Sequence, residues 1–182
     1  MPSAAELLRR FIDQAARASE WSVEGLTDDE YFWEPAPDCW TIHRTDDGWR
    51  IDDRPQPPKV TTIAWRLVHM ASCSAVYQSH TFGDRSMAWN EAPVPGDAMS
   101  AAAWLREANA RFEAGLRDVT DDDLNELRPT HWGKQLPIWQ LGASVAVDLV
   151  HHAGEIGVLR DLKRGGVRDE PYPEHHQDGR EL

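Results

Sequence analysis

The sequence lacks most features of a secreted or membrane-bound protein. It contains only two cysteines, Cys39 and Cys73, which match no CxxC spacing and cannot form a disulfide framework or a thiolate zinc cage. It also lacks a run of the roughly 18 apolar residues that a membrane span requires, and its first residues lack the apolar segment of a secretory signal. We therefore expect a cytoplasmic protein with reduced thiols and no membrane partner.

Positive charge is scarce as well. The chain has 19 lysines and arginines against 31 aspartates and glutamates, which gives a net charge of -12 at pH 7. This charge repels the phosphates of nucleic acid, and no cluster of basic residues offers a local exception. The balance argues against nucleic acid as a partner and leaves a small-molecule substrate as the expected ligand.

Tryptophan, in contrast, is abundant. Five of the 9 tryptophans lie between Trp21 and Trp65. This density indicates either a packed aromatic region, which is the simpler interpretation, or the wall of a pocket.

Apolar residues at helical spacing predict four long helices. The predicted helices cover residues 4–24, 61–82, 100–118 and 137–163. Ser3 and Ser100 are the predicted N-caps of the first and third helices, and Pro137 suits the first turn of the fourth. Because no alternating strand pattern is present, the sequence predicts an all-α fold with a four-helix bundle.

The connection between the first two predicted helices is unusually long. Residues 25–59 are rich in proline, aspartate and tryptophan, and only a short helical turn at residues 27–31 is predicted there. Loops of this length inside a compact domain are usually functional, so the loop is a candidate pocket lip. We expect one domain over residues 1–166 and a flexible C-terminal tail over residues 167–182.

The second predicted helix carries apolar residues on two faces, which places it at the centre of the bundle. The sequence allows two packing partners for its second apolar face. Either the third helix of the same chain packs there, or a second copy of the chain covers it and the protein is a homodimer.

The fourth predicted helix places ionisable side chains on its apolar stripe. At about 100° per residue, Asp148 and His152 lie among the apolar residues of one stripe. Burying a carboxylate costs several kcal/mol unless it is paired or bound to a cation. Two arrangements would offset the cost of burying Asp148. One is an ion pair with Arg66 or Arg160, and the other is a metal ion bound by the carboxylate and the imidazole at positions i and i+4.

A further histidine, His69, lies on an inward face of the second predicted helix. Across a bundle core, His69, Asp148 and His152 would form a site of two histidines and one carboxylate with open coordination positions. The simpler alternative is that the histidines are hydrogen-bonded core residues. Glu155 lies near the same stripe or forms a surface pair with Arg160, whereas His151 points to the flank and is the weaker ligand candidate.

Three segments resemble the DinB superfamily, which includes mycothiol-dependent maleylpyruvate isomerase and thiol S-transferases of similar fold. TTIAWRLVHM resembles the segment with the family's second-helix histidine, DLVHHAGEIGVLRDL its fourth-helix signature, and YFWEPAPDCWTI its loop after the first helix. The resemblance covers most of residues 4–163. It implies a four-helix bundle built around one small divalent-metal site.

The resemblance also implies which residues bind the metal. His69 and His152 take the family's histidine positions, and Asp148 takes the remaining ligand position, where many members have histidine. The implied metal is zinc or nickel, which holds a low-molecular-weight thiol cosubstrate as a thiolate for delivery to an electrophile.

Further roles are implied around these ligands. Glu155 would orient a ligand or accept a proton, and Trp40 and Trp65 would form the wall of the substrate pocket.

Two functional hypotheses follow. The first is a divalent-metal-dependent thiol S-transferase or isomerase, or a related hydrolytic enzyme, in which a metal-activated thiol or water is the nucleophile. The second is a non-catalytic module that binds a metal or a small molecule in a stress response. Catalysis requires an open metal position beside a tryptophan-lined cleft, whereas a binding module tolerates a closed or absent metal.

Overall fold

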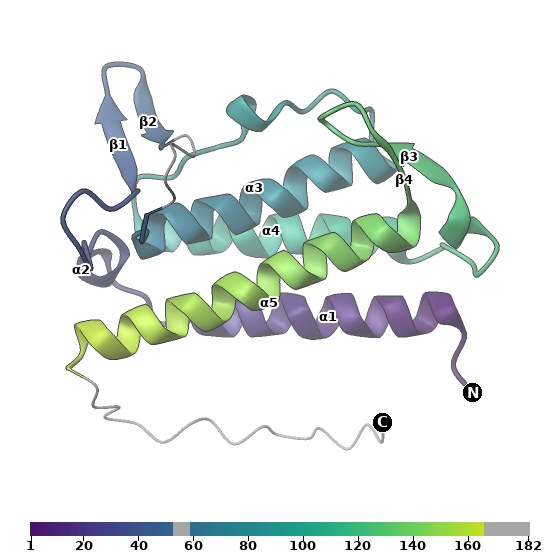
Figure 1. The fold of residues 1–182 in the computed structure, drawn as a ribbon, viewed down its shortest axis with the longest axis horizontal. Helices are drawn as coiled ribbons and strands as arrows, with labels where there is room; N and C mark the ends of the chain where they lie inside the picture. The colour runs from purple at the N-terminus through teal and green to yellow at the C-terminus, as the bar shows by residue number, and fades with distance from the viewer. Residues whose placement is uncertain (53–58, 166–182) are drawn as a thin grey trace.

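Four long helices form the body of the molecule, as predicted. The computed structural model describes residues 1–52 and 59–165. The helices are α1 (Ala4–Ser22), α3 (Ile63–Phe82), α4 (Ala98–Leu116) and α5 (Ile138–Lys163). Figure 1 shows α1 beside α5 and α3 beside α4, with α3 also packed on α5. This arrangement confirms the four-helix bundle.

The helix ends follow local capping chemistry. Ser3 caps α1 as predicted, because its side chain accepts a hydrogen bond from the backbone N–H of Glu6. The prediction for the third long helix was wrong: Asp97, not Ser100, caps α4. Asp97 has an extended backbone and its carboxylate accepts the N–H of Ser100, so the helix begins at Ala98. Pro137 precedes α5 as its N-cap.

Two small antiparallel hairpins join the helices, and the sequence pattern predicted neither of them. Strand β1 (Ile42–Thr45) pairs with β2 (Gly48–Ile51), and β3 (Leu127–Pro129) pairs with β4 (Gln135–Pro137). Strands of three or four residues are too short to show a clear alternation of apolar and polar side chains. The hairpins lie at opposite ends of α3, and the segment with the short 3-10 helix η1 (Trp89–Glu91) crosses between them (Figure 1).

The structure describes the predicted long loop after α1 through Asp52. It contains the short helix α2 (Asp28–Tyr31) and the β1–β2 hairpin. Backbone hydrogen bonds from Trp40 to Val60 and from Thr62 to Trp40 hold its middle against the start of α3. Residues 53–58 of this connection, and the predicted flexible tail over 167–182, lie outside the described residues.

Helix α3 is the centre of the core, and side chains on all its faces are buried. Its second apolar face packs on α4 of the same chain. The observation that suggested a homodimer is therefore explained within one chain, and dimerisation stays a prediction without support from this helix. Among the helices that the structure describes, none combines the length and the apolar composition needed to cross a membrane.

A buried ion pair joins α5 to the end of α1 and to α2. The Arg160 guanidinium donates to the Glu30 carboxylate, with Nε 3.1 Å from Oε1, and to the backbone carbonyls of Ser22 and Glu24. Arg164 adds a second contact to Glu30 at 2.8 Å. Burial alone would raise the pKa of Glu30, but the hydrogen bonds and charges of its partners hold that pKa below its ordinary value.

Candidate metal centre

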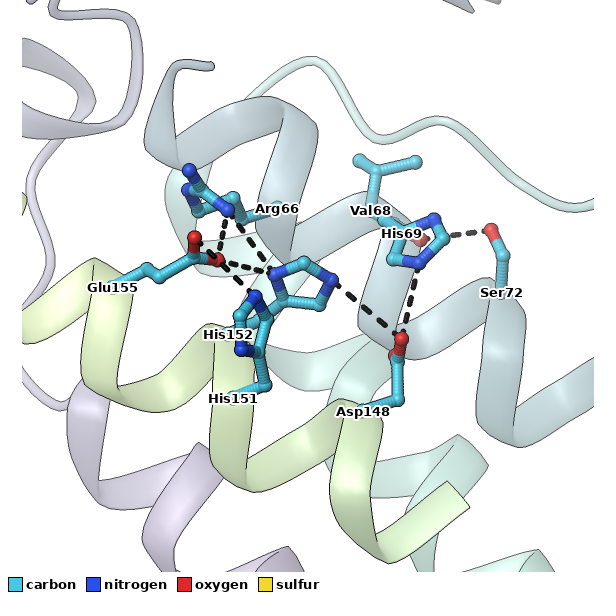
Figure 2. Close-up of polar contacts among 8 residues, drawn as sticks. All are labelled: Arg66, Val68, His69, Ser72, Asp148, His151, His152 and Glu155. Atoms are coloured by element: carbon cyan, nitrogen blue, oxygen red, sulfur yellow. Dashed lines mark hydrogen bonds and ion pairs between the residues drawn. The ribbon is translucent and has the colours of Figure 1, made fainter. Parts of the chain in front are cut away.

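Three side chains from two helices converge where α3 packs on α5. Nε2 of His69 lies 3.2 Å from Oδ1 of Asp148, and Nε2 of His152 lies 3.5 Å from the same oxygen. The potential ligand atoms of these three residues all lie within 4.8 Å of one another. Figure 2 shows the Asp148 carboxylate between the two imidazoles. The structure thus brings together the three residues that the sequence singled out as ligands.

Burial of this cluster costs free energy, because the Asp148 carboxylate is largely removed from water. Both histidines are buried, and the Asp148 side chain is only 22% exposed. Within the described part of the chain, Oδ2 of Asp148 is a buried atom without a hydrogen-bond partner. Burial would raise the pKa of Asp148, but the hydrogen bonds and charges of His152 and His69 hold it far below its ordinary range. The carboxylate is therefore ionised and has coordination capacity left over.

Glu155 fixes the orientation of the His152 ring from the side opposite Asp148. Nδ1 of His152 lies 2.6 Å from Oε2 of Glu155, and that carboxylate also forms an ion pair with Arg66 (Figure 2). An ionised carboxylate only accepts hydrogen bonds, so Nδ1 carries the proton and donates it. The Arg66 guanidinium, 3.1 Å from Nδ1, is then a neighbour rather than a second donor to that nitrogen.

In a neutral His152 ring this tautomer directs the lone pair of Nε2 at Asp148, whereas a protonated ring donates from Nε2 to that carboxylate. A lone pair and a carboxylate oxygen 3.5 Å apart repel each other unless a cation lies between them. A proton or a metal ion can supply that positive charge. The geometry therefore calls for a shared cation at this position.

The ion-pair alternative for Asp148 was wrong. In the described chain Arg66 pairs with Glu155, and Arg160 pairs with Glu30 on another part of the fold. The suggested surface pair between Glu155 and Arg160 is wrong for the same reason. Histidines, not arginines, contact the Asp148 carboxylate.

His151 differs from its neighbour. Its side chain is 63% exposed, and its Nε2 lies 3.4 Å from Oε1 of Glu155. It forms a second group of potential ligands with His152 and Glu155. Because Glu155 already binds Arg66 and the Nδ1 proton of His152, this group has less free coordination capacity than the buried one.

A cavity of about 600 Å³ opens beside the cluster. The residues that line it come from α3, α5, the end of β2, η1 and the β3–β4 turn: Ile51, Asp52, Trp65, His69, Cys73, Tyr77, Trp89, His131, Trp132 and Asp148. Two of the three candidate ligands thus face a space of the size that holds small molecules.

The two tryptophans predicted as pocket walls lie in different places. Trp65 lines the cavity and stacks on His69, with ring centroids 4.9 Å apart and planes 10° apart. Its indole N–H donates to the backbone carbonyl of Asp52. Trp40 is buried against Trp65 at a centroid distance of 5.5 Å and stands outside the described cavity lining. Trp65 therefore forms the wall, and Trp40 supports it.

Several lining residues escaped the sequence analysis. Trp89, His131 and Trp132 lie in a 3-10 turn and in a hairpin turn, where no helical period marks an inward face. Tyr77 lies eight residues after His69 on α3, with Cys73 halfway between them. That spacing is the one signal that could have identified Tyr77 as a neighbour of the site.

Glu155 is expected to act through His152, because it contacts the ring on the side away from Asp148. The Glu155→Gln variant keeps the size of the side chain but lowers its capacity to hold the Nδ1 proton in place. We expect its affinity for zinc to be weaker by about tenfold to a hundredfold, the usual effect of losing such a supporting partner. Competition titration against a chelator measures the change.

Glu107→Gln, on the exposed face of α4 where Glu107 pairs with Arg111, is the matched control and should bind zinc as tightly as the wild type. Equal affinities for the Glu155 variant and this control would show that Glu155 does not position His152.

Comparison with known proteins agrees with this fold. The family model of the DinB superfamily matches residues 11–156. The chain belongs to the DinB superfamily. The search of curated proteins gave no match.

Solved structures of similar fold include two bacterial proteins. A DinB-like protein from Bacillus cereus has a TM-score of 0.60 at 19% identity, and the match covers 89% of this chain and 95% of that one. A conserved protein from Enterococcus faecalis has a TM-score of 0.60 at 15% identity, with coverages of 91% and 99%.

A third similar structure is a variant of a mycothiol-dependent maleylpyruvate isomerase. Its TM-score is 0.57 at 10% identity, and the match covers 86% of this chain but 64% of that one. At these identities the likeness establishes the fold alone.

Proposed function

We propose that the protein binds a divalent metal ion, zinc or nickel, through His69, Asp148 and His152. We further propose that it is a thiol-dependent S-transferase or isomerase-like enzyme whose nucleophile is a metal-activated thiol or water. The observation that carries the proposal is the convergence of two buried imidazoles and one half-buried carboxylate on one point at the edge of a cavity.

The donor set fits such an ion. Two imidazoles and one carboxylate are ligands that zinc and nickel accept, and three protein ligands leave positions for a small molecule. The buried Oδ2 of Asp148, without a hydrogen-bond partner among the described residues, is a donor with free capacity. A bound cation would also relieve the repulsion between the Asp148 carboxylate and the lone pair of His152.

The residues around the site have separable roles. Glu155 holds the His152 ring so that Nε2 faces Asp148. Trp65 covers one face of His69 and limits access of water to it. When bound, the divalent ion would lower the pKa of a coordinated thiol or water, so that a nucleophile exists near neutral pH. The cavity then supplies the space in which an electrophile can approach.

The cavity favours catalysis over the binding-module alternative. A site that only stores or senses a metal needs no space beside its ligands, whereas His69 and Asp148 both line a volume of about 600 Å³. The name of the isomerase of similar fold supports a thiol as cosubstrate, although that likeness concerns the fold.

Cobalt substitution tests the proposal spectroscopically. We expect protein loaded with Co²⁺ to develop near-ultraviolet charge-transfer absorption when mycothiol, glutathione or cysteine is added and one of them binds as a thiolate. The His69→Ala variant should lose both the cobalt bands and this response, and the exposed His151→Ala variant should keep both.

Consumption of the responding thiol with a panel of electrophiles then measures turnover. Cobalt-loaded wild type that gives no charge-transfer band with any thiol would contradict the thiol-dependent part of the proposal. A response that survives in His69→Ala would contradict the assigned ligand set.

A further inference from the structure

A row of aromatic rings extends from the candidate ligand His69 to the protein surface. The Trp89 ring lies 5.3 Å from that of His69 and 5.5 Å from that of His131, and His131 lies 4.6 Å from Trp132. Trp89 belongs to η1, and His131 and Trp132 belong to the β3–β4 turn. Trp89, His131 and Trp132 all line the cavity, although they come from elements outside the helical bundle.

Core packing accounts for part of the Trp89 ring, which is half-buried against the hydrophobic core, but not for the two outer rings of His131 and Trp132. Trp132 is 45% exposed, and His131 is exposed beside it at the tip of a hairpin with three-residue strands. Large aromatic side chains at an accessible cavity mouth contribute little to the free energy of folding, because they remain largely in contact with water. Such rings are typical of a surface that a ligand covers.

The charges around the cavity limit which charge the ligand can carry. Apart from its histidines, the described lining has two ionisable side chains of full charge at neutral pH, the carboxylates of Asp52 and Asp148. Asp52 contacts His43 at 3.0 Å, and Asp148 lies between two histidines. Aromatic faces also carry negative charge density, which attracts cations and repels anions. Before any metal ion binds, the described side chains of the wall therefore favour a neutral or cationic group over an anionic one.

We propose that the cavity binds a substrate with a flat aromatic ring that carries no negative charge. The ring lies against Trp89, His131 and Trp132, and the reacting atom points toward His69 and Asp148. The direction of the reacting atom rests on the proposed function. The ring subsite itself does not, since none of the three aromatic residues is a candidate metal ligand.

Four probes that are poor metal ligands test the subsite: benzyltrimethylammonium, benzyl alcohol, benzenesulfonate and the saturated cation (cyclohexylmethyl)trimethylammonium. Ligand-observed NMR titration of the full chain gives the four dissociation constants. We expect benzyltrimethylammonium to bind about threefold or more tightly than its saturated counterpart and about fivefold or more tightly than benzenesulfonate, with benzyl alcohol between the cation and the anion.

Two exposed tryptophans provide matched variants. Trp132 is 45% exposed and lines the cavity, whereas Trp139 is 47% exposed in the first turn of α5 and lies outside the described lining. We expect Trp132→Ala to weaken benzyltrimethylammonium binding by about fivefold or more, Trp132→Phe to restore most of it, and Trp139→Ala to leave it unchanged.

Each outcome decides the proposal. Equal affinity for the aromatic and saturated cations, tighter binding of benzenesulfonate, or equal effects of the Trp132 and Trp139 variants would overturn it. Because the probes do not need the metal, binding can persist in the His69→Ala variant even if the proposed metal chemistry fails. Wild type that binds the probes but takes up no cobalt would therefore contradict the proposed function and leave the ring subsite standing.

Discussion

Asp148→Asn lowers the affinity of the protein for zinc or nickel by more than about a hundredfold. The variant keeps the shape of the side chain but removes the negative charge that lies between His69 and His152. An amide oxygen is a much weaker ligand for these ions than a carboxylate. Competition with a chelator of known affinity measures the change, and circular dichroism checks that the helices persist.

The control for this substitution is Asp47→Asn in the β1–β2 turn, where the Asp47 side chain is 86% exposed. It should bind the metal as the wild type does. If Asp148→Asn and Asp47→Asn bound zinc equally, the carboxylate between the histidines would be a purely structural partner of the two rings.

Arg160→Met lowers the free energy of unfolding by about 3 kcal/mol, because it leaves the buried Glu30 carboxylate with an incomplete set of partners. The side chains of Arg160 and Glu30 are 11% and 7% exposed. The substitution also removes the donors to the carbonyls of Ser22 and Glu24. Denaturant unfolding followed by circular dichroism measures the loss.

Arg111→Met, which breaks the exposed pair with Glu107, should cost less than about 1 kcal/mol and serves as the control. A loss in Arg160→Met no larger than in this control would show that the buried pair contributes little to stability.

The effect of Arg160 depends on pH in a defined direction. The pKa of Glu30 is lower in the folded chain than its ordinary value of 4.5. The unfolded chain therefore binds a proton at Glu30 more readily than the folded chain does. The stabilisation by the Arg160–Glu30 pair is complete above pH 4.5 and is lost as the pH falls through the lower pKa of Glu30 in the folded chain. We expect the difference in unfolding free energy between wild type and Arg160→Met to shrink as the pH falls below 4.5. A difference that grows on acidification would contradict this account.

The long helices, and the stripe of α5 that carries Asp148 and His152, could be predicted because the sequence patterns that indicate them are local. Asp148 and His152 lie four residues apart on α5, and the period of 3.6 residues that buries Val145 and Ile156 buries His152 with them. His69 follows from the same argument on α3. The start of α4 was predicted wrongly at Ser100, because aspartate and serine are both good N-cap residues and only the extended backbone at Asp97 identifies the residue that caps the helix.

The partners across the bundle could not be predicted in the same way. Arg66 and Glu155 are 89 residues apart, and nothing in either helix indicates which arginine reaches which carboxylate. That choice depends on how α3 and α5 are placed along each other. The sequence therefore left open which side chains the carboxylates of Asp148 and Glu155 contact, and the packing of α3 on α5 decides it.

The outer wall of the cavity was missed for a different reason. Trp89 and Trp132 lie on an element of three residues and in a turn, and such short pieces carry no period from which an inward face can be inferred. The density of tryptophans between residues 21 and 65 drew attention to the loop after α1 instead. Of the two tryptophans predicted as pocket walls, Trp65 on α3 lines the cavity and Trp40 in the loop supports it from within the core.

X-ray absorption spectroscopy on the purified protein, combined with its elemental analysis, tests the central claim most directly. The account predicts near-stoichiometric zinc or nickel whose first coordination shell contains two imidazole nitrogens and at least one carboxylate oxygen. Protein that contains neither metal and takes up neither when it is offered would contradict the account, and the buried carboxylate of Asp148 would then need another cation.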